Sequence, residues 1–217
     1  MTQSCIIVEA GPGIGAAVAR RFGREGFALG LVSRHPQALA GELTAEGLSA
    51  RPYPADAGDG AALTAAIQQA QADLGPAGVL VYNPAAVRRE PLSGISGAEL
   101  LERLKLSVAG ALDAVRAVLP GMQAVRSGTI VFTGGGLALQ PSAAYGSLSV
   151  GKAALRTLSL ALAEELAPQG VHVATVTVAG LVQPGTPFDP ERIAQVYWDL
   201  HTKAAGRWQR EVVFDGK

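Results

Sequence analysis

A tyrosine and a lysine stand near each other at the start of an alanine-rich helical pattern, in the stretch AAYGSLSVGKAAL at residues 143–155. Tyr145 and Lys152 are seven residues apart, so a helix would carry both side chains on one face. A phenol and an ammonium group in this arrangement can donate a proton to a substrate oxygen or remove one from it. Whether the stretch is an active site, a shifted active site or the surroundings of one depends on the elements around it.

A glycine-rich turn follows the first apolar run of the chain. In CIIVEAGPGIGAAVARRF, a predicted strand leads through Gly11, Gly13 and Gly15 into a helical pattern. Glycines let the backbone turn tightly and approach a pyrophosphate, and a helix start offers free N–H groups and a partial positive charge. The turn therefore predicts a dinucleotide site that includes Ile14, although glycines also simply end strands.

The second predicted strand ends in Ser33 and Arg34, where folds that prefer NAD usually carry an acidic residue for the ribose hydroxyls. An arginine can form a forked, charge-assisted pair with a 2′-phosphate. The two residues therefore favour NADP, with NAD as the alternative. An ordinary solvated surface arginine is the other interpretation of Arg34.

The elements that must position these residues alternate between short β-branched runs and longer alanine-rich helical patterns. Strands are predicted at 5–8, 27–33, within 50–56, and at 77–83, 127–134, 170–178 and 210–214. Helices are predicted at 13–26, near 36–46, at 60–75, and over about 97–119, about 143–167 and 189–201. This alternation predicts a doubly wound parallel sheet of about seven strands with helices on both faces. Residues 1–217 are expected to form a single α/β domain.

The composition fits a globular chain and argues against several classes of partner. Lys plus Arg equals Asp plus Glu at 18 each, so no net charge favours nucleic acid or an anionic membrane. No apolar run approaches the ~18 residues of a spanning helix, and a cytoplasmic location is expected. Cys5 is the only cysteine and is expected to pack in the core. Neither His172 nor His201 has the partners of a metal site.

The glycine turn and the order of the elements resemble the short-chain dehydrogenase/reductase family. Gly13 and Gly15 fit the last two glycines of its TGxxxGxG pattern, whereas Glu9 stands at the first. A carboxylate there would repel a pyrophosphate, and a β-carbon suits the turn poorly; Glu9 could instead face solvent or cap an N–H group. The resemblance covers almost the whole chain. It implies a Rossmann-type fold, a small carbonyl or alcohol substrate, and a homodimer or homotetramer.

Further positions resemble cofactor-binding residues of that family. Asp56 resembles the aspartate that binds the adenine amino group, and Asn83 matches the second Asn of the NNAG stretch. Gly180 fits the PG motif, and Val182 could present its backbone N–H to the nicotinamide carboxamide. The alternatives are a helix-capping Asp56 and an Asn83 that only ties strands together. The resemblance implies that Lys152 binds the nicotinamide ribose, unless it is a snorkelling helix lysine.

The catalytic residues of the family are only partly present. The family uses an Asn, a Ser, a Tyr and a Lys, because hydride transfer to a carbonyl leaves negative charge on oxygen that needs a donor and a proton. Here Ser107 stands for the Asn, Gly135 for the Ser and Leu148 for the Tyr, while Lys152 is kept. Tyr145, one helical turn before the usual Tyr position, could act from the rim as a substitute acid or simply pack there.

Three aromatic residues occupy the region that covers the substrate in this family, namely Phe188, Tyr197 and Trp198. They are candidates to line a pocket. Aromatic residues at helical spacing more often belong to the core, which is the alternative.

Three functions remain open from the sequence. The first is an NADP-dependent oxidoreductase with weakened chemistry, since the loss of a general acid typically costs ~10²–10⁴-fold in rate. The others are a dinucleotide-binding regulatory protein and a structural oligomer subunit, because a fold does not determine a function. Arg34, Asn83 and Lys152 favour the first two, whereas Glu9 and Gly135 favour the last two. The oxidoreductase class is favoured.

Overall fold

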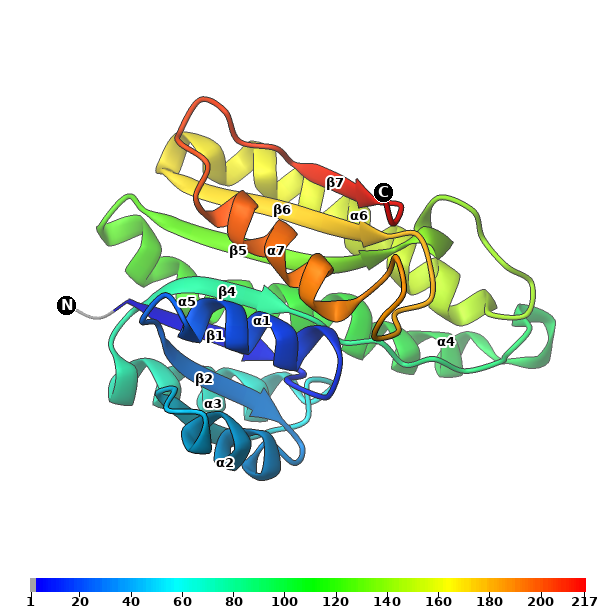
Figure 1. Cartoon of the computed structure of the whole chain (residues 1–217). Coiled ribbons are helices and arrows are strands. Elements are labelled where there is room, and N and C mark those ends of the chain that lie inside the picture. The colour runs from blue at the N-terminus through cyan, green and yellow to red at the C-terminus, as the bar shows by residue number, and fades with distance from the viewer. Residues whose placement is uncertain (1–2) are drawn as a thin grey trace.

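The short β-branched runs form the strands of one parallel sheet in the computed structural model, which describes residues 3–217 (Figure 1). The strands are β1 (Ser4–Val8), β2 (Ala28–Ser33), β3 (Ala50–Pro54), β4 (Ala77–Tyr82), β5 (Gly128–Gly135), β6 (Val171–Val178) and β7 (Glu211–Phe214). Their order is β3-β2-β1-β4-β5-β6-β7, and the prediction of a seven-stranded, doubly wound sheet is confirmed. The strand order reverses between β1 and β4, and folds of this class bind ligands beyond the carboxyl ends of the strands at such a point.

Helices cover both faces of the sheet and bury two separate apolar layers. One layer is closed by α1 (Ile14–Gly23), α2 (Gln37–Ala45) and α7 (Pro190–His201), and the other by α3 (Gly60–Leu74), α5 (Gly110–Ala124) and α6 (Gly146–Leu166). Figure 1 shows α1 and α7 on the near face and α6 on the far face. Successive strand residues alternate between the layers, as Cys5 and Ile6 do. Cys5 is fully buried, as predicted.

The helix predicted over 97–119 is divided into three pieces. They are α4 (Gly97–Leu104), a π-helical segment (Lys105–Ala109) and α5, which continues to Ala124. The Tyr82 hydroxyl donates to the carbonyl oxygen of Leu106 within the π segment, so the widened turn satisfies a buried donor from β4. A side chain at Gly110 would collide with Ala57 and Tyr82, which brings α5 close to the sheet.

The long helix predicted from about residue 143 begins later, at Gly146. Tyr145 is the residue before the helix, with a non-helical backbone (φ −128°, ψ 45°), and its N–H donates to the carbonyl oxygen of Ser142. Its backbone also pairs with Glu90, and the N–H of Gly146 donates to the carbonyl oxygen of Glu90 at 3.1 Å. This contact with a distant segment holds residues 143–145 out of the helix.

Three short 3₁₀ helices complete the chain, at Leu92–Gly94, Gly136–Ala138 and Ala167–Gln169. Within residues 3–217, no helix combines the length and the apolar character that crossing a membrane requires. The same residues contain no group of three or more His, Cys, Asp or Glu side chains placed to hold a metal ion.

Candidate cofactor and active site

The turn between β1 and α1 has a backbone that only glycines adopt readily. Gly13 has a φ of +98° directly before α1 begins at Ile14. Gly15 packs so close to the end of β1 that a β-carbon there would lie 3.0 Å from the carbonyl oxygen of Glu9. In the described chain no side chain caps the start of α1, and the N–H of Ala16 donates to the carbonyl oxygen of Gly11. The N–H groups of Ile14 and Gly15 are thus left for an anion. The turn that also contains Gly11 therefore fits a pyrophosphate.

Glu9 occupies the strained position at the start of this turn. Its φ is +57°, in the left-handed region where side chains are disfavoured by about 1–2 kcal/mol. Three hydrogen bonds fix this backbone: its N–H donates to Val32 O at 2.7 Å, and its carbonyl oxygen accepts from Gly11 N at 2.9 Å and from Asn83 Nδ2 at 3.1 Å. Burial raises the pKa of the Glu9 carboxyl, and the charge of Arg34 partly offsets the shift.

Two cavities adjoin at this turn, because Pro12 and Gly13 line both of them. One, of about 580 Å³, lies on the β2 side, and the other, of about 770 Å³, lies over the ends of β4 and β5. The predicted cofactor residues divide between them: Gly11, Ser33 and Arg34 line the first, Ile14, Asn83, Lys152, Gly180 and Val182 line the second, and Gly13 lines both.

Asp56 lies outside the residues that line these two cavities. Its carboxylate accepts from the N–H of Gly58 at 2.8 Å and closes a turn ahead of α3. The residue that caps α3 is Asp59, whose carboxylate accepts from two N–H groups of the first turn. Asp56 is thus not the helix cap that one interpretation suggested.

A chain of hydrogen bonds runs beneath the larger cavity. The Thr133 hydroxyl donates to Asn83 Oδ1 at 2.8 Å and lies 2.7 Å from the Tyr197 hydroxyl. Because the single proton of Thr133 goes to Asn83, Tyr197 must donate to Thr133. Asn83 in turn donates to Glu9, so it does tie the ends of β4, β5 and β1 together while lining the cavity. Tyr197 itself is fully buried in the core.

Lys152 points inward rather than snorkelling to the surface. Only 7% of the residue is exposed, and Nζ donates to the carbonyl oxygens of Thr133 at 2.6 Å and Pro84 at 3.3 Å. Burial lowers the pKa of Lys152 to about 8. The ammonium group therefore sits at the ends of β4 and β5, where it lines the larger cavity.

Two positions at which the sequence predicts the loss of a hydroxyl group also face this cavity. Leu148, one turn before Lys152 on α6, and Gly135, at the end of β5, both line it. A β-carbon at Gly135 would lie 3.7 Å from three carbons of the Lys152 side chain, which is ordinary contact. Gly135, Leu148 and Lys152 thus line one cavity, and of the three only Lys152 has a polar side chain.

Tyr145 and Ser107 lie apart from Lys152. Tyr145 is half-buried before α6, outside the described residues that line the cavity, and the Arg89 guanidinium lies 5.9 Å from its ring centre. Ser107 is in the π segment, where its hydroxyl donates to the carbonyl oxygen of Arg103 at 3.3 Å. It packs against Gly151 on α6 and is not among the described residues that line the cavity.

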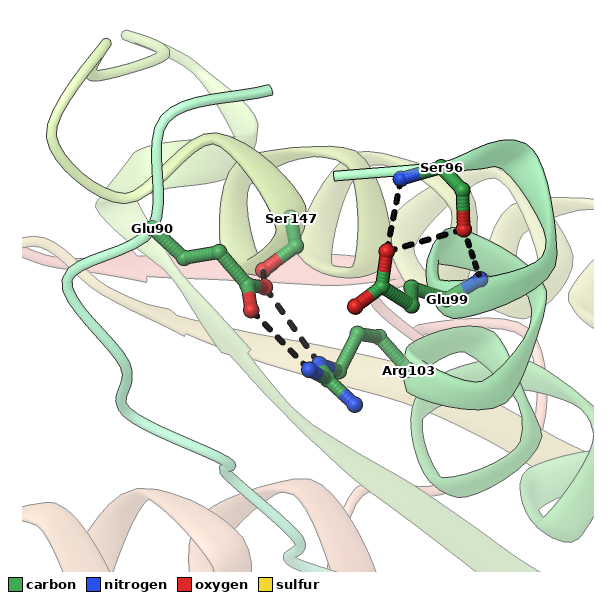
Figure 2. Close-up of polar contacts among 5 residues, drawn as sticks. All are labelled: Glu90, Ser96, Glu99, Arg103 and Ser147. Carbon is green, nitrogen blue, oxygen red and sulfur yellow. Dashed lines mark hydrogen bonds and ion pairs between the residues drawn. The ribbon is translucent and has the colours of Figure 1, made fainter. Parts of the chain in front are cut away.

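A cluster of polar contacts that no local sequence pattern indicates connects the segment after β4 to α4 and α6 (Figure 2). The Glu90 carboxylate accepts from Arg103 Nη2 at 2.9 Å and from the Ser147 hydroxyl at 2.7 Å; we call these three residues the Glu90 clasp. The hydrogen bonds, with Arg103 first, lower the pKa of the Glu90 carboxyl. The clasp connects the segment after β4 to α4 and to the start of α6. The same segment contributes Val87 to the cavity lining.

The start of α4 beside the clasp is a capping box, also drawn in Figure 2. The Ser96 hydroxyl accepts from Glu99 N, and the Glu99 carboxylate accepts from Ser96 N. The S-x-x-E spacing is a sequence signal for such a start. Nothing local in the sequence marks the contact of Glu90 with Ser147.

Comparisons with known proteins agree with this architecture. Residues 3–192 match the family model for short chain dehydrogenases. The chain is 30% identical over 183 residues to 2,3-dihydro-2,3-dihydroxybenzoate dehydrogenase of Bacillus subtilis (strain 168), covering 83% of this chain and 68% of that protein. It is 30% identical over 205 residues to oxidoreductase UcpA of Escherichia coli (strain K12), covering 88% and 77%.

Among solved structures, a metagenomic short-chain oxidoreductase in complex with NADP superposes with a TM-score of 0.88 at 28% identity, covering 97% of this chain and 96% of that one. The chain belongs to the short chain dehydrogenase family.

Proposed function

We propose that this protein is an NADP(H)-dependent oxidoreductase that transfers hydride between the nicotinamide and the carbon of a small carbonyl or alcohol compound. The observation that carries the proposal is the pair of adjoining cavities, with Arg34 at one end, Gly13 between them and Lys152 at the other. A 2′-phosphate, a pyrophosphate and a nicotinamide ribose follow one another in the same order along NADP. The similarity to a structure that contains NADP supports the same cofactor.

Each of the two adjoining cavities has groups that suit a part of NADP. The Arg34 guanidinium and Ser33 hydroxyl can hold a 2′-phosphate, and the N–H groups at the start of α1 can hold the pyrophosphate. Asn83 can bind the nicotinamide ribose, Lys152 can direct its remaining N–H either to that ribose or to the substrate oxygen, and the Val182 N–H can bind the carboxamide. For catalysis we retain Lys152 as the central residue, while Tyr145 and Ser107 would act only from outside the cavity lining.

A second candidate is a protein that binds the dinucleotide without turnover. Leu148 and Gly135 favour it, because they present apolar atoms where the family has hydroxyl groups. A homodimer or homotetramer also remains a proposal, supported by the exposed apolar side chains of Leu101 on α4 and Leu112 on α5. The cytoplasmic location expected from the sequence stays a prediction.

A titration of NADPH, followed by its fluorescence, tests cofactor binding. Replacement of Arg34 by Gln removes a charge-assisted contact and is expected to weaken NADPH binding by about 10- to 100-fold. NADH binding by the same variant should change by less than about threefold, since NADH lacks the 2′-phosphate. Absence of saturable NADPH binding to the wild type at millimolar cofactor would rule out both candidate functions.

A further inference from the structure

The larger cavity contains one ionisable side chain. Among the described residues that line it, Lys152 alone titrates, and the other polar side chains are those of Asn83, Thr133 and Gln140. A carbonyl oxygen that gains negative charge during hydride transfer needs a proton. Within this lining, Lys152 is the candidate to supply it.

The hydroxyl groups around the cavity are already committed to other acceptors. Thr133 donates its proton to Asn83, and Ser147 donates to Glu90. Ser149 donates to the carbonyl oxygen of Tyr145 at 2.9 Å. Each hydroxyl has a single proton, so none of these three can protonate a substrate without breaking a bond it makes.

Lys152 has one N–H donor that no described backbone or side-chain acceptor takes. An ammonium group carries three N–H donors, and the carbonyl oxygens of Thr133 and Pro84 take two of them. These two backbone acceptors hold Nζ at the ends of β5 and β4 and leave the third N–H for the cavity that Lys152 lines.

Charged groups on α6 and on the elements packed against it form three ion pairs, and the Glu99 carboxylate on α4 bonds to Ser96. The pairs are Arg103 with Glu90, Lys105 with Glu102, and Arg156 on α6 itself with Glu211. His172 on β6 bonds to the carbonyl oxygen of Gln209, and Glu9 lines the neighbouring cavity. Burial is therefore the main influence on the protonation of Lys152, and it favours release of the proton.

The walls of the cavity indicate what kind of carbonyl compound fits. Leu137, Leu148 and Val182 form apolar walls, and Val87 and Leu139 line the cavity while keeping 69% and 43% of their surface exposed. The walls hold no carboxylate and no second cation among the described residues. A charged group on the substrate would lose its hydration without a partner for it, whereas an apolar group would gain by burial.

We propose that Lys152 donates the proton to the oxygen of an uncharged, largely apolar aldehyde or ketone in this cavity. The proposal rests on the proposed function, because NADPH, when bound, supplies the hydride that forms the new C–H bond. The π electron pair of the C=O bond then moves to oxygen, which takes the third N–H proton of Lys152 and becomes a hydroxyl. The neutral amine regains a proton from solvent. In the reverse direction the amine accepts the proton of an alcohol.

The test compares the wild type with Lys152→Arg and Lys152→Met in the reduction of 4-nitrobenzaldehyde at saturating NADPH, from pH 6 to pH 10. Wild-type kcat/KM should be level at low pH and fall as pH rises past about 8, because only the ammonium form is an acid. Lys152→Arg keeps the positive charge but does not release a proton in this range. It should lower kcat/KM by about 10²–10⁴-fold and remove the pH break. Lys217→Arg, at a side chain that is 90% exposed, is the matched control and should behave as wild type.

A second readout does not depend on turnover. Competitive acetylation with peptide mass spectrometry measures the pH at which each amine becomes reactive. Lys152 should reach half-reactivity near pH 8. Circular dichroism and NADPH titration of the Lys152 variants establish that they fold and bind; Lys152→Met serves if the arginine variant fails to fold.

Three results overturn the proposal: a flat wild-type pH profile from 6 to 10, a Lys152→Arg variant that keeps its rate, or a wild type that binds NADPH yet reduces no uncharged aldehyde. The first two results leave the proposed function standing. The third counts against the proposed function as well, as does a wild type that binds no NADPH at all.

Discussion

Glu9 is predicted to weaken cofactor binding, and two substitutions separate the reasons. Glu9→Gln removes the charge and keeps the side chain, whereas Glu9→Gly also removes the β-carbon from a backbone with a φ of +57°. Both variants should bind NADP⁺ more tightly than the wild type, because a carboxylate at the same cavity as Arg34 repels the phosphates.

The size of the effect follows from Coulomb's law. Two like charges roughly 7 Å apart repel by about 2 kcal/mol at an effective dielectric constant of ~20, and partial exposure of Glu9 reduces this to about 1–2 kcal/mol. The expected gain in NADP⁺ affinity is about 5- to 30-fold for Glu9→Gln. Glu9→Gly should also unfold at higher denaturant than Glu9→Gln, since relief of about 1–2 kcal/mol of strain exceeds the about 0.5–1 kcal/mol entropic cost of glycine.

The pH dependence provides a further check. Because the pKa of Glu9 is raised in the folded protein, protonation is favoured there: the contribution to stability is present in acid and is lost as pH rises through the raised value. The ionised form repels the cofactor and the protonated form does not. Wild-type affinity for NADP⁺ should therefore approach that of Glu9→Gln as pH falls through the raised pKa.

Isothermal titration calorimetry measures the affinity of each variant and its pH dependence, and NADP⁺ is the ligand because it tolerates acid. The control is Glu25→Gln, since the Glu25 side chain pairs with Arg21 away from the two cavities. Weaker binding by Glu9→Gln would refute the reasoning and would show that the carboxylate accepts hydrogen bonds from the cofactor instead.

Three more predictions concern the larger cavity and its supports. Leu148→Tyr combined with Gly135→Ser should raise kcat/KM for aldehydes at least about tenfold, measured by NADPH consumption, since a second acid and an oxygen-binding hydroxyl join Lys152. Arg103→Met should break the Glu90 clasp, lower the melting temperature at pH 7 and speed hydrogen exchange in residues 83–91. Because the pKa of the Glu90 carboxyl is lowered in the folded protein, the clasp stabilises the fold at pH values above the ordinary carboxyl pKa. This stabilisation is lost only as pH falls through the lowered pKa. Tyr197→Phe should cost about 1 kcal/mol, a fall of about 2–4 °C in melting temperature by calorimetry, because it removes the donor to Thr133.

The sheet was predictable because its central strands are buried on both faces. Runs such as CIIV and GVHVATVTV are almost continuously apolar or β-branched, and the alternation with helical patterns leaves few arrangements open. The predicted elements accordingly match β1 to β7 within about one or two residues.

The errors arise where distant segments override local preference. The break at Lys105–Ala109 serves a hydrogen bond from Tyr82 on β4, and the late start of α6 results from backbone contacts with Glu90. Neither partner is close in sequence, so helical periodicity alone could not indicate them.

The site was predictable in its residue types but not in its geometry. The glycine turn and Arg34 follow one another in a recognisable order, and the structure places them around adjoining cavities. Lys152 is buried, and two of its N–H groups donate to backbone carbonyl oxygens while the third is left over. This arrangement depends on the ends of β4 and β5, so the sequence of its own helix could not indicate it.

The transfer of an isotopic label tests the central claim most directly. The wild type is incubated with 4-nitrobenzaldehyde and NADPH carrying deuterium at C4, in separate reactions with the 4R and 4S labels, and the alcohol is analysed by mass spectrometry. Hydride transfer predicts one deuterium on the carbinol carbon from one of the two labels and none from the other. Alcohol that forms without deuterium from either label, or no alcohol at all from an enzyme saturated with NADPH, would contradict the assignment of this protein as an oxidoreductase.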